Sequence, residues 1–108
     1  MKVEVLYVAD CPSHPAAVRL VRDVLRKEDV LVEVEELLVA NECMARSLRF
    51  HGSPTIRING RDVAEDSPHS RAAFGLSCRL YPGSGTLQLP SAELVRHAVV
   101  EARKGGHR

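Results

Sequence analysis

The sequence predicts a small α/β fold with a mixed four-stranded sheet, in the element order β-α-β-α-β-β-α and with an extra hairpin before the last helix. Three observations predict this fold. Two strand-like segments flank an amphipathic helix, which is typical of a parallel β-α-β unit. The dipeptide Asn59-Gly60 joins two further short apolar runs, the pattern of a tight antiparallel hairpin. A last amphipathic segment then closes the sequence as a helix.

The first half of the chain alternates strand and helix patterns. Lys2 to Ala9 alternates at first and then becomes wholly apolar, as expected of a strand buried on both faces. From Ala16 to Lys27, valines and leucines recur at helical spacing between charged residues, which indicates an amphipathic helix. Val30 to Val39 alternates with glutamates and predicts a second strand. Because a helix of this length joins them, the two strands are expected to be parallel, in a right-handed β-α-β unit.

The second half begins with Asn41, a residue suited to cap a helix at its N-terminus. Ser91 is a second candidate cap of the same kind, placed before the last apolar run. The expected elements are a helix over Glu42 to Phe50 ended by His51-Gly52, strands over Ile56 to Asn59 and Arg61 to Ala64, a loop over Glu65 to Gly75, a small hairpin over Leu76 to Leu89, and a helix over Ala92 to Arg103.

The composition is ordinary for a globular protein. The chain has 108 residues, of which 44% are hydrophobic and 27% charged, and a net charge of +1. We expect one domain over residues 1–104 and a disordered tail over 105–108. No apolar run approaches the roughly 20 residues of a membrane-spanning helix, and no secretory leader precedes the first strand. We therefore expect a cytoplasmic protein without membrane contact. Four scattered aromatic residues do not support nucleic-acid binding.

Three cysteines, Cys11, Cys43 and Cys78, leave at least one free thiol. Cys11 falls where the first strand meets the first helix. Free amides and the helix dipole favour a thiolate at a helix N-terminus, and the thiolate is the nucleophile in disulfide exchange. His14 lies three residues on and adds positive charge when protonated. The pattern predicts a reactive monothiol at Cys11; the alternative is an unreactive cysteine buried at a strand end.

The start of the first helix decides how strongly Cys11 is activated. Pro15 disfavours helical geometry at the residue before it, so the helix begins either at Pro12 or later, at His14 or Pro15. A start at Pro12 leaves Cys11 at the helix N-terminus, because Pro15 then falls in the first turn, where no amide bond is lost. A later start leaves Cys11 outside the first turn and weakens the effect of the dipole. The sequence leaves both open.

This element order, with a cysteine after the first strand and a proline opening the third, resembles the thioredoxin-like fold over nearly the whole chain. Cys11-Pro12-Ser13-His14 stands where glutaredoxin-like members carry Cys-Pro-x-Cys, and Ser53-Pro54-Thr55 stands where the family has its cis-proline. More narrowly, Cys11-Pro12, Gly52 to Thr55 and Phe74 to Arg79 resemble the pattern of small bacterial thioredoxin-like proteins. Some of these relatives carry selenocysteine at a redox position, and some are labelled mercury-lyase-like.

The resemblance implies a thiol-disulfide oxidoreductase in which Cys11 is the nucleophile. It implies a cis bond at Pro54, facing the thiol, with backbone beside it that pairs with an extended peptide. The expected partner is a protein or a small molecule that carries a thiol or a disulfide, with glutathione as a candidate co-substrate and no other cofactor or metal. The candidate catalytic residues are Cys11, His14 and Cys78, and the candidate substrate-binding residues are Pro12, Ser53, Pro54 and Thr55.

Position 14 holds no second cysteine, so a mixed disulfide at Cys11 is not resolved within the motif. Three routes are open: a small thiol such as glutathione resolves it, a remote cysteine (Cys78 or Cys43) resolves it, or the protein does not cycle. Cys78 matches the relatives' pattern, although we slightly favour the interpretation that it is a small apolar residue on the inward face of a hairpin strand. Cys43 is expected to be a packing or surface residue.

Two other functions compete with exchange. One is thiol-based binding of a soft metal such as mercury, or an organomercurial lyase built from Cys11, Cys78 and the proton donor Asp10. The other is a thioredoxin-like binding module without turnover. The Cys-x-x-His half-site alone falls short of the four ligands that zinc requires. The remaining histidines are scattered and are expected to be solvated or packed; they are His51, His69 and His97.

Overall fold

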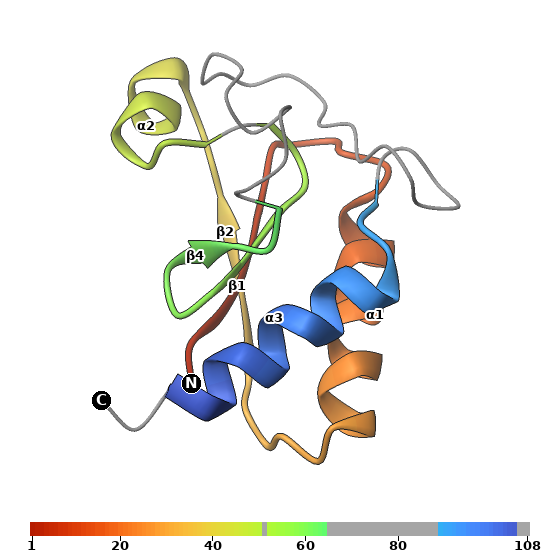
Figure 1. Ribbon diagram of the computed structural model, residues 1–108. Coiled ribbons are helices and arrows are strands. Elements are labelled where there is room, and N and C mark those ends of the chain that lie inside the picture. The colour runs from red at the N-terminus through yellow and green to blue at the C-terminus, as the bar shows by residue number, and fades with distance from the viewer. Residues whose placement is uncertain (51, 65–88, 106–108) are drawn as a thin grey trace.

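The computed structural model describes residues 1–50, 52–64 and 89–105, which form a mixed four-stranded sheet and three helices (Figure 1). Within these residues the predicted order β-α-β-α-β-β-α is confirmed. The elements are β1 Val3–Tyr7, α1 His14–Lys27, β2 Val34–Leu38, α2 Glu42–Ser47, β3 Thr55–Ile58, β4 Arg61–Asp62 and α3 Ala92–Gly105. The predicted loop and extra hairpin, apart from its last residue, and the last three residues of the predicted tail lie outside the described residues.

The strands lie in the order β2-β1-β3-β4. β1 pairs with β2 in parallel and with β3 antiparallel, so Leu6 lies between Leu37 and Thr55. The β3–β4 hairpin turns at Asn59 and Gly60, whose φ angles of 54° and 82° are those of the turn that suits a two-residue hairpin. The predicted parallel unit and the predicted hairpin are both confirmed.

Helices cover both faces of the sheet (Figure 1). On one face, α1 and α3 pack over a core that includes Val3 and Val5. On the other face, α2 packs over a smaller core that includes Leu6 and Phe50. Successive residues of a strand point to opposite faces. β1 therefore supplies apolar side chains to both cores, which explains its nearly continuous apolar sequence.

Both α1 and α2 end in the same hydrogen-bonded motif. After α1, Asp29 adopts a left-handed φ of 55°, and the Val30 N–H donates to the Leu25 carbonyl at 2.9 Å. This Schellman motif turns the chain away before it becomes extended. β2 therefore begins at Val34, and its predicted start at Val30 is wrong.

α2 ends at Ser47, so the predicted extension of this helix to Phe50 is wrong. Arg49 adopts a φ of 54°, and the Phe50 N–H donates to the Ala45 carbonyl at 2.8 Å. Phe50 is fully buried against Ala45, which is the apolar contact that accompanies this motif. From β3, the Arg57 guanidinium donates to the carbonyls of Leu48 and Arg49 and completes the cap.

The two predicted N-caps are confirmed. The Asn41 side chain accepts a hydrogen bond from the Met44 N–H at 2.8 Å, and the Ser91 hydroxyl accepts one from the Leu94 N–H at 3.1 Å. α3 continues through Gly105, two residues beyond its predicted end at Arg103. In the described part of the chain, no helix combines the length and the apolar character that crossing a bilayer requires.

Glu28 joins the C-terminal end of α1 to α3. Its carboxylate accepts hydrogen bonds from Arg96 and Arg103, each at 3.1 Å, and Arg103 also donates to the Glu28 carbonyl at 2.7 Å. The Glu28 side chain is only 16% exposed. These bonds hold together the two helices that cover the larger core.

Replacing Glu28 with Ala should lower the free energy of unfolding by about 1–2 kcal/mol. The change removes charge-assisted hydrogen bonds that are shielded from water on the Glu28 side, although the arginines remain partly exposed. Urea denaturation measures this loss. Glu33→Ala is the matched control, because Glu33 is exposed and takes part in no ion pair with the described residues. Equal unfolding midpoints for the two variants would contradict a stabilising role of Glu28.

Candidate functional site

Cys11 sits between two consecutive β-turns that follow β1. Its N–H donates to the Val8 carbonyl at 3.3 Å, and the third residue of this first turn, Asp10, has a φ of 62°, as a type II turn requires. The Cys11 carbonyl accepts a hydrogen bond from the His14 N–H at 3.3 Å. This second turn has Pro12 in second place and a third residue near −91°, −5°, the geometry of a type I turn.

The thiol of Cys11 is free and half-buried, while its backbone is held on both sides. A nucleophile needs access to its substrate and a fixed position. The two turns fix the position of the Cys11 backbone. The alternative of a cysteine fully buried at the strand end is not what the structure shows.

α1 begins at His14, with Ser13 as the N-cap residue, so the later of the two helix starts is the observed one. The helix does not start at Pro12. Cys11 lies two residues before the N-cap residue. The His14 N–H is bonded to the Cys11 carbonyl, and Pro15 has no N–H to offer. Cys11 therefore lies outside the first turn of α1, the region in which the helix dipole acts most strongly.

The His14 ring is fixed from two sides. It stacks on the Tyr7 ring with a centroid distance of 3.6 Å and an interplanar angle of 4°. Its Nε2 lies 2.7 Å from the Glu36 Oε1. Tyr7 ends β1 and Glu36 lies in the middle of the neighbouring strand β2, so the first residue of α1 is attached to two strands of the sheet.

The segment before β3 lies next to the first of these turns. The Ser53 hydroxyl accepts a hydrogen bond from the Val8 N–H at 3.1 Å, and the Ser53-Pro54 peptide bond is cis, as the resemblance implies. The Thr55 hydroxyl donates to the Gly52 carbonyl at 2.6 Å. Ser53, Pro54 and Thr55 are buried, whereas Pro12 is exposed. The segments Cys11-Pro12 and Ser53-Pro54-Thr55 thus lie at the same end of β1.

The other candidate residues are not gathered there. Cys43 is a free, exposed thiol on α2, which covers the opposite face of the sheet from α1. His97 lies on α3, 3.9 Å from Glu101. Among the described residues, no three histidine, cysteine or acidic side chains form a possible metal site. Cys78, His51 and His69 lie outside the described residues, so the role of Cys78 as a thiol that resolves a Cys11 disulfide stays a hypothesis.

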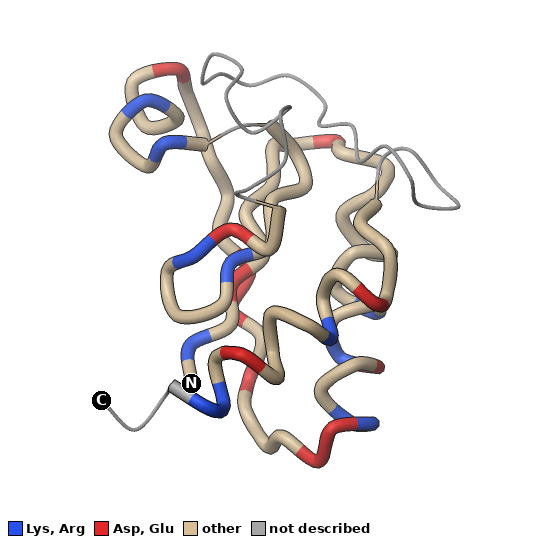
Figure 2. Tube along the Cα trace, in the orientation of Figure 1, with Lys and Arg blue, Asp and Glu red and all other residues tan. Residues whose placement is uncertain are grey.

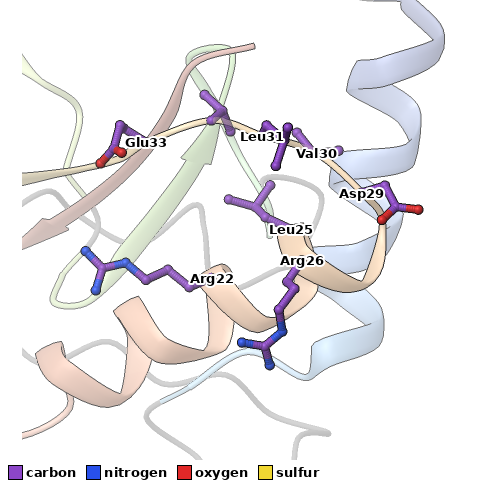
Figure 3. Close-up of a pocket in the computed structure, with 8 residues that line it drawn as sticks. Arg22, Leu25, Arg26, Asp29, Val30, Leu31 and Glu33 are labelled. Carbon is purple, nitrogen blue, oxygen red and sulfur yellow. The ribbon is translucent and has the colours of Figure 1, made fainter.

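A surface hollow lies at the opposite end of α1 from Cys11 (Figure 3). Leu25 forms its apolar floor, Leu31 is fully exposed at its edge, and Arg22 lies beside it. Charged residues of both signs are interspersed along the described chain, without a long stretch of one sign (Figure 2). Neither feature involves the β1–α1 junction.

No model of a known protein family, no curated protein and no solved structure matches this chain. The geometry of the β1–α1 junction is therefore the basis for inferring its function.

Replacing Ser53 with Ala should lower the free energy of unfolding by about 1–2 kcal/mol, because the Val8 N–H then loses its partner in a partly buried position. Ser47→Ala, at an exposed position of α2, should change it by less than about 0.5 kcal/mol. Chemical denaturation of both variants provides the comparison. Equal effects would mean that the Ser53 hydroxyl does not hold the segment before β3 to the end of β1.

Proposed function

We propose that this chain is a thioredoxin-like protein whose Cys11 thiol exchanges with a disulfide or with a glutathione adduct. One observation carries the proposal: a free, half-buried thiol stands at the end of a central strand, with its backbone fixed by hydrogen bonds on both sides. Disulfide exchange needs a thiolate that a second sulfur can approach. Cys11 is accessible, and the turns leave its backbone little freedom.

The arrangement of the sheet supports the thioredoxin-like assignment. The strand order β2-β1-β3-β4, the parallel β1–β2 pair and the helices on both faces agree with the fold expected from the resemblance. The reactive cysteine follows β1, and a proline with a cis bond precedes β3 at the same end of β1. A reducing cytoplasm, where glutathione keeps thiols free, is the compartment that suits such a protein.

The reaction proceeds in two exchanges. The Cys11 thiolate attacks one sulfur of a disulfide, a new sulfur-sulfur bond forms, and the other sulfur leaves as a thiolate. A glutathione thiolate then attacks the mixed disulfide and releases Cys11 as a thiolate. The two exchanges consume one glutathione, which leaves as a disulfide with the group that Cys11 had captured; when that group is itself glutathione, the product is glutathione disulfide. Because position 14 is a histidine, the second exchange needs a thiol from outside the motif.

The soft-metal alternative needs Cys78 as a second thiolate beside Cys11 and Asp10. Cys78 lies outside the described residues, and no observation on the described part of the chain favours this alternative over exchange.

Replacing Cys11 with Ser should abolish adduct formation with oxidised glutathione and reduce turnover of a dialkyl disulfide at least about 100-fold, because an alcohol does not replace a thiolate in this reaction. Intact-protein mass spectrometry detects the adduct as a mass increase of about 305 Da, the mass that one glutathione adds in a mixed disulfide. An assay that couples turnover to the consumption of glutathione follows the reaction.

Cys43→Ser is the control for Cys11→Ser, since it removes an exposed thiol on the other face of the sheet. It should leave both readouts unchanged. If the unmodified protein forms no adduct, or if Cys11→Ser forms it equally well, Cys11 is not the nucleophile. If Cys78→Ser leaves adduct formation intact but stops its release, Cys78 and not glutathione performs the second exchange.

A further inference from the structure

The exchange reaction leaves one proton unassigned. When a dialkyl disulfide is cleaved, the leaving sulfur departs as a strongly basic thiolate, and a nearby acid that protonates it accelerates the step. His14 is the titratable group closest to Cys11 along α1. Its N–H donates to the Cys11 carbonyl within a β-turn, and this turn keeps the two α-carbons within about 7 Å.

The contacts of His14 leave one ring nitrogen available. Nε2 is engaged by the Glu36 carboxylate at 2.7 Å. Nδ1 has no hydrogen bond to any described residue, and the side chain is 21% exposed. A protonated imidazole has an N–H at each nitrogen. With Nε2–H directed at Glu36, Nδ1–H is the proton that remains for a group bound at Cys11.

Glu36 and Tyr7 restrict the ring to one orientation. The carboxylate fixes the direction of the Nε2–H bond. The parallel stack on Tyr7 fixes the ring plane. The side chains come from β1 and β2, whose register is set by backbone pairing and not by the turn that holds Cys11.

We infer that His14 donates the proton to the departing thiolate through Nδ1, and that Glu36 and Tyr7 are positioning residues for His14. The inference rests on the proposed exchange at Cys11. In the step, the Cys11 thiolate bonds to one sulfur of the substrate, the sulfur-sulfur bond breaks, and the leaving sulfur takes the Nδ1 proton. Neutral His14 then regains a proton from water. Proton donation matters for disulfides whose leaving thiol is a weak acid, so the preferred substrate class is the dialkyl disulfide, which includes glutathione disulfide.

Two probe substrates separate proton donation from a structural role. Bis(2-hydroxyethyl) disulfide releases an alkyl thiolate that benefits from protonation, whereas 5,5′-dithiobis(2-nitrobenzoate) releases a stable aryl thiolate that does not. Single-turnover rates of reduced protein with each substrate are measured at neutral pH. His14→Phe keeps an aromatic ring that can stack on Tyr7 but removes the proton. It should slow the reaction with the alkyl disulfide about tenfold or more and change the rate with the aryl disulfide less than about twofold.

Glu36→Gln keeps an oxygen that can accept a hydrogen bond from Nε2 but removes the charge. It should slow the reaction with the alkyl disulfide about three- to tenfold, and it should have no further effect in the His14→Phe background. Glu35→Gln is the matched control, because this neighbouring exposed glutamate points to the other face of β2. It should match the unmodified protein with both substrates.

The outcomes are distinct. Equal losses with both substrates in His14→Phe, or an additive effect of Glu36→Gln in that background, would assign His14 to holding the turn and would overturn the inference. Equal rates for Glu36→Gln and Glu35→Gln would remove Glu36 from the mechanism. If the unmodified protein reacts with neither substrate at Cys11, the exchange function itself fails. Unfolding midpoints of all variants identify any that lose activity by losing the fold.

Discussion

The position of Cys11 depends on the burial of β1. This strand pairs on both sides, and its side chains enter the cores on both faces of the sheet. Its register is therefore strongly specified, since a shift by one residue would exchange the side chains of the two cores. The turn that carries the thiol starts from the C-terminal end of this strand, and Ser53 holds the same end of β1 to the segment before β3.

The sequence was sufficient to predict the order of the elements, and it was less informative about where they end. Periodicity located β1 and α1, and Asn59-Gly60 located the hairpin, because these signals arise from local geometry. The end of α1 was predicted correctly at Lys27, whereas α2 was predicted too long and β2 was predicted to start too early. Each helix is followed by a residue in a left-handed conformation that is not glycine. These residues are Asp29 after α1 and Arg49 after α2. Tertiary contacts support these conformations: Phe50 is drawn into the smaller core after α2, and no local pattern specifies that burial.

The candidate site was predicted in part. Cys11 and the cis bond at Pro54 were expected from the resemblance, and the structure brings their segments to one end of β1. Glu36 and Tyr7 were missed as partners of His14. The signal was present in principle, because a parallel register places alternate residues of β1 and β2 on the face that α1 covers. It could be used only once the register and the first residue of α1 were known, and Pro12 and Pro15 left that residue open.

Asp10 shows how backbone geometry restricts the choice of residue next to the Cys11 thiol. Its φ of 62° suits glycine, asparagine and aspartate, and a valine or isoleucine at this position would strain the chain. The backbone conformation at this position is thus sufficient to account for an aspartate just before the sulfur. Natural variation at position 10 should accordingly be confined to glycine, asparagine and aspartate, whether or not the side chain is charged.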